Sequence, residues 1–230
     1  IEDQDNESAQ DNLLRIHKAA IRGKKTIKQF MAINQQREKP KQLLKISDTV
    51  KASMNLFGAT IPSTIQLKND VTPDLGLIAG NQTQIRQVIM NLCNNARDAM
   101  QTTGGILEVS LASMDIPIER IHQYPGLTPG NHAKLTITDT GSGMDRDALE
   151  HIFDPFYTTK GEGKGKGRGL GLSITYGIVK THGGIIYVNS IVDVGPTFVI
   201  LFPLIDAVGD QEESSAVERK GEPLVQPLLV

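Results

Sequence analysis

An asparagine-rich stretch constrains the fold of this chain more than any other segment. Residues 82–101 have the spacing of a helix with two stripes, one apolar and one polar. We expect the apolar stripe to face a core, and its members are Ile85, Ile89, Leu92, Ala96 and Ala99. The polar stripe consists of Gln84, Gln87, Asn91, Asn95 and Asp98. The segment therefore predicts a packed helix with an unusual polar surface.

The polar stripe has two interpretations. An ordinary solvated helix face carries Lys and Glu, whereas Asn is a mediocre helix former. A neutral amide oxygen is also a hard ligand that suits a Mg²⁺ ion already carrying phosphate oxygens. On its own, the stripe fits either a satisfied polar face or a metal site.

Length and charge narrow the classes of protein that need to be considered. The 230 residues can hold one ordinary domain of ~150 residues plus extensions. A net charge of −2 gives no indication of nucleic-acid binding or of a membrane surface. The single Cys93 excludes an internal disulfide framework and suits a reducing cytosol. No apolar run approaches the ~20 residues that span a bilayer. We expect a cytoplasmic location, with membrane attachment only through segments outside this chain.

The chain divides into three parts. Residues 1–40 contain a long helix, from Ser8 to about Arg37, with one apolar seam and a basic outer face. Such a helix needs a partner, which is a second copy of the chain or a segment outside it; the alternative is packing against the main domain. Residues 42–204 form the main domain, and residues 205–230 read as a disordered tail or interdomain linker. Because the chain begins at Ile1 rather than Met, we expect it to be part of a longer protein.

The main domain alternates amphipathic helices with short strands. The expected helices cover residues 43–58, 82–101 and 170–181. The expected strands cover residues 65–67, 77–79, 106–111, 133–139, 185–189 and 197–202, with a long hairpin loop at 113–131. This order predicts an α+β fold, a two-layer sandwich in which helices cover one face of a mixed, mostly antiparallel sheet.

Two glycine-containing segments have the residues of a nucleotide site. Asp139 ends a strand and is followed by Gly141 and Gly143, so its carboxylate can accept a hydrogen bond from an exocyclic amine close to the backbone; the alternative is an ordinary hairpin turn. Residues 161–171 alternate glycine with other residues and lead into a helix, where free N–H groups attract phosphate. The alternative there is a mobile surface loop. Neither segment has the spacing of a Rossmann turn or a P-loop.

In this order, the segments resemble the catalytic ATP-binding domain of sensor histidine kinases, a Bergerat (GHKL) fold, and the resemblance covers about residues 42–204. Residues 91–100 match the N box and residues 139–144 the G1 box. Residues 152–160 match the F box and residues 167–172 the G2 box. The combination of boxes is far more specific than any one of them.

The resemblance implies ATP and Mg²⁺ as cofactors and assigns a role to each matched position. Asn95 would bind the metal with Asn91 in support, and both would be catalytic together with Lys160. Asp139 would read the adenine amino group, and Gly141 and Gly143 would let the ring approach. The other implied nucleotide-site residues are Asp98, Phe153 and Phe156 as lid anchors, Gly165, Gly167, Gly169, Leu170 and Gly171 in the phosphate cover, and Thr197 in the last box. Two positions depart from the family pattern, namely Pro196 in place of a glycine and Arg168 in place of a small Thr or Ser.

The implied activity is transfer of the γ-phosphoryl group of ATP to a histidine outside this chain. Residues 1–40 then resemble the second helix of a dimerisation hairpin, and the implied partners are a second copy of the full-length protein and a response regulator receiver domain. Among the 5 histidines, His17 lies on the long helix but is followed by Lys18 rather than by an acidic residue. Related hydrolases have a Glu as general base where this chain has Asn91, which favours transfer over hydrolysis. The alternatives are a GHKL-type ATPase or serine kinase, and a nucleotide-gated binding module without catalysis.

Overall fold

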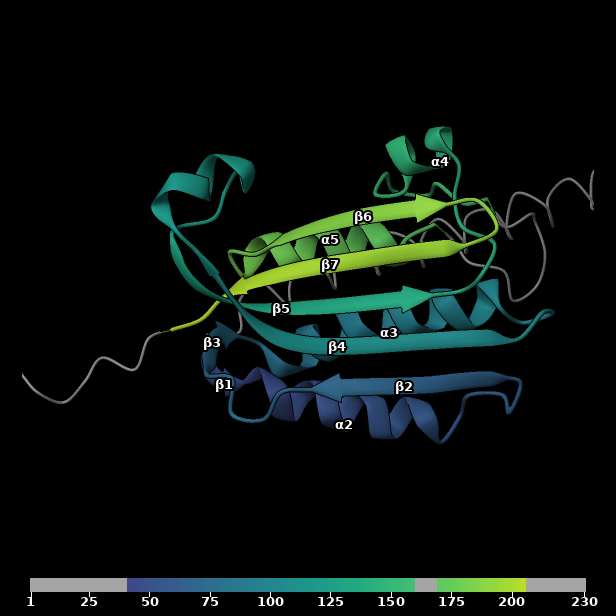
Figure 1. The fold of residues 1–230 in the computed structure, drawn as a ribbon, viewed down its shortest axis with the longest axis horizontal. Helices are drawn as coiled ribbons and strands as arrows, with labels where there is room; N and C mark the ends of the chain where they lie inside the picture. Colours follow the sequence, from purple (N-terminus) through teal and green to yellow (C-terminus); the bar gives the residue numbers. More distant parts are fainter. Residues whose placement is uncertain (1–40, 160–168, 206–230) are drawn as a thin grey trace, which may run out of the picture.

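A five-stranded sheet is the centre of the structure, a computed structural model that describes residues 41–159 and 169–205 (Figure 1). The strand order is β2 (Ile65–Val71), β4 (Gly105–Ile116), β5 (Gly130–Asp139), β7 (Gly195–Pro203) and β6 (Ile185–Ile191). β2 pairs with β4 in parallel, and the other neighbours are antiparallel. The sheet is therefore mixed and mostly antiparallel, as the sequence predicts.

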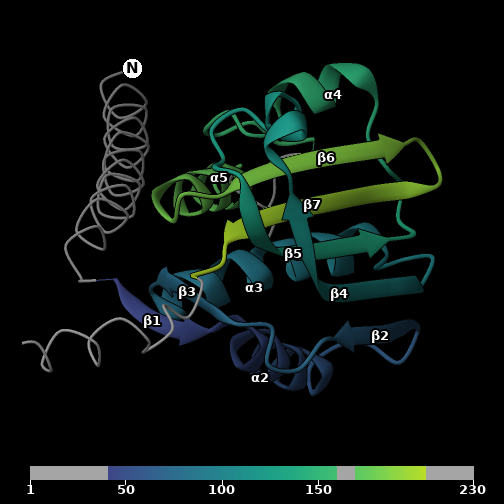
Figure 2. The same cartoon turned by 60° about the vertical axis from the view of Figure 1, so that its left-hand side comes forward.

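Three helices cover one face of this sheet: α2 (Ile46–Gly58), α3 (Gln82–Ala99) and α5 (Gly171–Thr181) (Figures 1 and 2). The apolar stripe of α3 faces the core as expected, since Ile85, Ile89, Leu92 and Ala96 are all buried. Alternate residues of β5, including Leu135 and Ile137, belong to the same core. These observations confirm the α+β two-layer sandwich.

A second, two-stranded sheet lies beside the first, and it corrects one predicted helix. β1 (Gln42–Lys45) pairs antiparallel with β3 (Leu77–Gly80), so the prediction that a helix begins at residue 43 is wrong. Lys45 is extended and directly precedes α2. Leu77 also pairs with Ile205, whose N–H donates to the Leu77 carbonyl at 2.8 Å. Hence β2 and β3 do not pair with each other across the turn that separates them.

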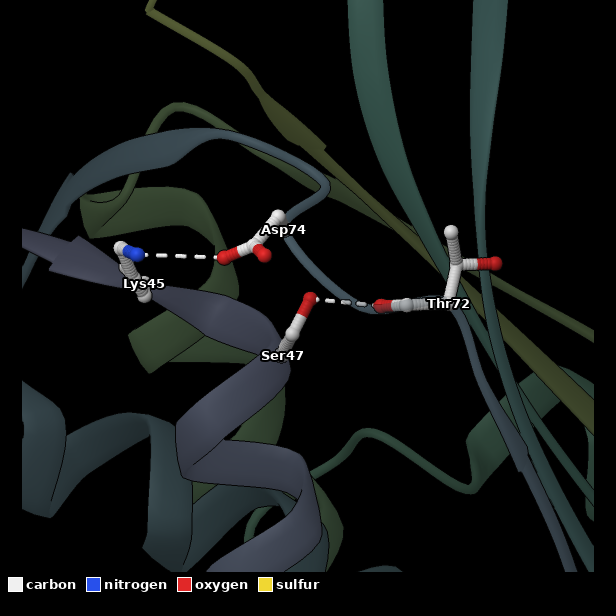
Figure 3. Close-up of polar contacts among 4 residues, drawn as sticks. All are labelled: Lys45, Ser47, Thr72 and Asp74. Atoms are coloured by element: carbon white, nitrogen blue, oxygen red, sulfur yellow. Dashed lines mark hydrogen bonds and ion pairs between the residues drawn. The ribbon is translucent and has the colours of Figure 1, made fainter.

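Two polar contacts tie the loop between β2 and β3 to the start of α2 (Figure 3). The Ser47 hydroxyl, which is buried, donates to the Thr72 carbonyl at 2.8 Å. The Lys45 ammonium lies 3.1 Å from the Asp74 carboxylate. Because this ion pair is exposed to water, it contributes little compared with the part-buried hydrogen bond of Ser47.

The segment predicted as a long hairpin loop at 113–131 is more ordered than expected. β4 continues to Ile116, a 3₁₀ helix, η2 (Ile118–Gln123), follows, and β5 begins at Gly130. Together with β6 and β7, the segment forms a small second core made of Ile116, Leu127, Ile185 and Leu201. A short helix that the sequence analysis did not predict, α4 (Arg146–His151), follows the Asp139 segment.

Three predicted features lie outside the described residues: the long helix at 8–37, most of the phosphate cover, and the tail after residue 205. Among the helices of the described ranges, none is long and apolar enough to cross a bilayer.

Candidate nucleotide-binding site

A cavity of about 300 Å³ opens where α3, α5 and the ends of β5 and β7 meet. Asn95 from α3 and Asp139 from β5 line the same cavity, together with Gly143, Gly169 and Gly171. Its volume lies at the lower end of the ~300–1,000 Å³ that is usual for small-ligand sites. Residues far apart in the sequence therefore converge on one space, as the resemblance implies.

Asp139 supplies the charged group of this cavity. It ends β5 and is 4% exposed, and its Oδ1 accepts the N–H of Gly141 at 2.9 Å. Burial raises the pKa of the carboxyl, and the hydrogen bond from Gly141 opposes that rise. Within the described parts of the chain, Oδ2 accepts no hydrogen bond. Asp139 thus has an oxygen available to accept a hydrogen bond from a ligand amine.

Neighbouring protein atoms leave no room for a Cβ at the two glycines that follow Asp139. A Cβ on Gly141 would lie 2.7 Å from the Ala99 Cβ and 2.7 Å from the Asp139 Oδ1. Gly143 has φ +65°, and a Cβ there would overlap the Ile191 carbonyl. These glycines were predicted to let a ring approach, and in the structure they also pack closely against α3 and β6.

Asn95 and Asn91 lie one turn apart on α3 and have different surroundings. Asn95 lines the cavity, and its amide makes no hydrogen bond to any described residue. The Asn91 amide nitrogen donates to the Gly171 carbonyl at 3.1 Å and, more weakly, to the Thr175 hydroxyl at 3.4 Å. Asn91 therefore connects α3 to the first turn of α5 and does not line the cavity.

Several other predicted residues also lie outside the cavity lining. Asp98 is exposed and pairs with Arg97 at 3.2 Å. Thr197 lies on the opposite face of the sheet, where its hydroxyl hydrogen-bonds that of Thr138 at 3.1 Å. Its neighbours Pro196 and Phe198 line the cavity instead, because successive side chains of a strand point to opposite faces.

The two F-box phenylalanines, Phe153 and Phe156, do not line the cavity. The Phe153 ring contacts that of Tyr176 on α5, with centroids 5.3 Å apart. Phe156 is 58% exposed, has φ +70°, and its N–H donates to the Gly169 carbonyl at 2.8 Å. Leu170 precedes α5 and is not part of the lining. Lys160, Gly165 and Gly167 lie outside the described residues.

Much of the cavity wall is apolar, and this wall was not predicted from the sequence. Its apolar members include Met144, Ala148, Ile152, Tyr157, Leu172 and Phe198. Ala148 and Ile152 come from α4 and its end, where the Asp145 carboxylate caps the helix by accepting the Ala148 N–H at 2.8 Å. An Asp followed by apolar residues at helical spacing is the signal that predicts this wall.

Comparison with known sequences identifies the family of this chain. The family described as "Histidine kinase-, DNA gyrase B-, and HSP90-like ATPase" matches residues 80–206. The chain is 34% identical over 216 residues to the sensor kinase CckA of Brucella abortus, covering 92% of this chain and 22% of that protein. It is 30% identical over 165 residues to the sensor histidine kinase ZraS of Salmonella typhimurium, covering 71% of this chain and 31% of that protein. The chain therefore spans less than a third of each of these relatives.

Solved structures agree on the fold. The mycobacterial sensor histidine kinase MprB superposes with a TM-score of 0.56 at 24% identity, covering 71% of this chain and 97% of that one. Full-length ShkA in complex with AMPPNP gives a TM-score of 0.55 at 21% identity, covering 71% of this chain and 31% of that one. With the fold, the shared cavity and the sequence match in agreement, the chain belongs to the family of histidine kinase-, DNA gyrase B- and HSP90-like ATPases.

Proposed function

We propose that this chain is the ATP-binding catalytic part of a sensor histidine kinase. It binds Mg-ATP and positions the γ-phosphoryl group for transfer to a histidine on a segment outside this chain. The observation that carries the proposal is the shared cavity of Asn95 and Asp139, because an amide and a buried carboxylate that line one cavity suit the metal-bound phosphates and the base of a nucleotide. The names of the relatives CckA and ZraS support a kinase over other members of the family.

Asp139 recognises the base. Its free Oδ2 accepts a hydrogen bond from the exocyclic amine of adenine, while the apolar wall formed by Met144, Ile152 and Phe198 contacts the ring. A base with a carbonyl in place of this amine would place two acceptors against each other. The arrangement therefore favours adenine over guanine.

Asn95 holds the metal end of the nucleotide. Its amide oxygen is a hard donor, has no partner among the described residues, and faces the same cavity, so it fits Mg²⁺. The bound ion would neutralise charge on the phosphate oxygens during transfer. Lys160, Gly165 and Gly167 cover the phosphates in this proposal, as the resemblance implies.

Transfer is favoured over hydrolysis because the residue one turn before Asn95 is not a base. Asn91 cannot take a proton at neutral pH, and its amide nitrogen already donates to Gly171 and Thr175. We propose a receiver domain of a response regulator and a second copy of the full-length protein as partners. A cytoplasmic location fits this role.

Titration with AMPPNP, with and without Mg²⁺, tests the proposal. We expect Asp139→Asn to weaken binding at least about tenfold under both conditions, because a charged acceptor is replaced by an amide. Asn95→Ala should weaken binding less, and only when Mg²⁺ is present, since water can replace one ligand of the ion. Asn94→Ala is the matched control, because Asn94 is a half-buried neighbour that does not line the cavity.

Two results would contradict the proposal. Absence of Mg²⁺-dependent binding by the unmodified chain would overturn the nucleotide site. Steady ATP turnover without any histidine acceptor, measured as phosphate release, would favour the hydrolase alternative.

A further inference from the structure

The hairpin formed by β6 and β7 contacts the loop that follows Asp139. We call residues 140–144 the base loop. The Met144 N–H donates to the Ser190 hydroxyl at 2.8 Å, and the Asp193 N–H donates to the Ser142 carbonyl at 2.9 Å. Ser142 and Met144 both line the cavity. Hydrogen bonds from the hairpin therefore fix the backbone of residues that contact the proposed base.

Two glycines show how closely the hairpin and the base loop approach. A Cβ on Gly143 would overlap the Ile191 carbonyl. A Cβ on Gly195 would overlap the Asp139 carbonyl, directly before the base loop, and would lie 3.1 Å from the Thr140 Cα. Both glycines have positive φ, +65° at Gly143 and +117° at Gly195. The two segments thus meet backbone to backbone, so a shift of the hairpin displaces the base loop.

Ser190 supplies the side-chain contact of this junction. Ile186 and Val188 belong to or pack on the main core, so alternation along β6 places Ser190 on the same, helix-covered side. Ser190 pairs with Pro196, which lines the cavity. The contact from Asp193 uses its backbone N–H and survives most substitutions, whereas the bond to Met144 requires the hydroxyl of Ser190.

We propose that Ser190 is a positioning residue for nucleotide binding. Its hydroxyl holds the Met144 backbone, and through Met144 it fixes the wall against which the base packs. The inference rests on the proposed function, since it names a residue that acts on the same site. It places the effect of Ser190 at the base and not at the metal or the phosphates.

The experiment compares Ser190→Ala, Ser190→Thr and the control Asn189→Ala, whose side chain is exposed on the other face of the same strand. Dissociation constants are measured for AMPPNP, ADP and adenosine, each with Mg²⁺ and with EDTA. We expect Ser190→Ala to weaken binding about three- to tenfold, by the same factor for all three ligands and in both conditions. Ser190→Thr keeps the hydroxyl and should restore binding, and Asn189→Ala should match the unmodified chain.

A stability effect alone would not produce this pattern, so thermal unfolding is recorded for each variant. Equal binding by Ser190→Ala and the unmodified chain would overturn the inference, and so would a loss confined to Mg-AMPPNP. If Ser190→Ala does not fold, binding by Ser190→Thr and hydrogen exchange of the Met144 amide in the unmodified chain replace it as the test. Rapid exchange of this amide would overturn the inference. An unmodified chain that binds none of the ligands overturns the proposed function instead.

Discussion

The two ends of α3 are built from similar polar residues but differ in how these residues are satisfied. At the N-terminal end, the Asn81 side chain accepts the N–H groups of Thr83 and Gln84, and the Asn81 N–H donates to the His182 Nε2 at 3.0 Å. The His182 Nδ1 donates to the Ile178 carbonyl at 2.8 Å. At the C-terminal end, Asn95 faces a cavity and has no hydrogen-bond partner among the described residues.

This comparison separates a structural polar cluster from a binding site. At both ends burial disfavours the charged form of a titratable side chain, because it lowers the pKa of His182 and raises the pKa of Asp139. His182 uses both ring nitrogens within the protein, whereas one oxygen of Asp139 accepts no hydrogen bond from residues 41–159 and 169–205. Substitutions at the closed end should therefore change stability, and those at the open end should change affinity.

The largest effect on stability is expected for His182→Ala. The substitution leaves the Asn81 N–H and the Ile178 carbonyl without their partner and removes a ring packed on Phe202, so we expect a loss of about 2–4 kcal/mol of unfolding free energy. Urea unfolding measures it. AMPPNP affinity should stay within about twofold under conditions where the variant is folded.

His151→Ala is the matched control, because His151 is an exposed histidine whose ring hydrogen-bonds the Asp154 carboxylate. Its unfolding free energy should be close to that of the unmodified chain. A comparable loss for both variants, or a large loss of affinity in His182→Ala, would break the distinction between the two ends.

An intermediate effect is expected for Asn91→Ala, at the junction of the two regions. Because Asn91 connects α3 to the first turn of α5, we expect a loss of about 1–2 kcal/mol in urea unfolding. Affinity for AMPPNP should fall less than in Asp139→Asn, since Asn91 does not line the cavity. An affinity loss without any loss of stability would instead assign Asn91 to the site itself.

The smallest effect is the pH dependence of stability, and it has opposite signs at the two ends. The folded His182 has a pKa below the usual 6.5, so its contribution is present above pH 6.5 and is lost as the pH falls below that value. The folded Asp139 has a pKa above the usual 3.8, so its contribution is present below pH 3.8 and is lost as the pH rises through the folded pKa.

Urea unfolding of the unmodified chain and of Asp139→Asn between pH 4 and pH 8 checks both signs. Asp139→Asn should be slightly more stable than the unmodified chain at neutral pH, and the difference should shrink toward pH 4. A variant that is less stable than the unmodified chain at neutral pH would show that the Asp139 carboxylate stabilises the fold, contrary to this expectation.

The sequence predicted the convergence of the site better than the details of its wall. The helical spacing of Ile85, Ile89 and Leu92 is a local signal, and it correctly identified the buried side of α3. The box pattern also implied that Asn95 and Asp139 share one site, and both line the same cavity. The first prediction depends on a local pattern, whereas the second came from the resemblance to a known family, because Asn95 and Asp139 lie far apart in the sequence.

The features that were not predicted depend on contacts between distant segments. Leu43 and Leu44 fit a helix as well as a strand, and pairing with β3 decides between the two. The position of Thr197 could have been predicted, because Phe198, Ile200 and Phe202 alternate along β7 and place Thr197 on the other face. The bond from Ser190 to Met144 has no sequence signal, since any serine in a strand carries the same hydroxyl.

The pairing of Leu77 with both Lys45 and Ile205 has a mechanical consequence. The two points at which the backbone joins and leaves the sandwich are anchored on one short strand, and that strand runs through Gly80 directly into the cap of α3 at Asn81. We expect a force or torque applied at either anchor to displace the N-terminus of α3, the helix that carries Asn95, before it displaces the rest of the sheet. The short strand β3 would therefore transmit movement at either anchor to α3.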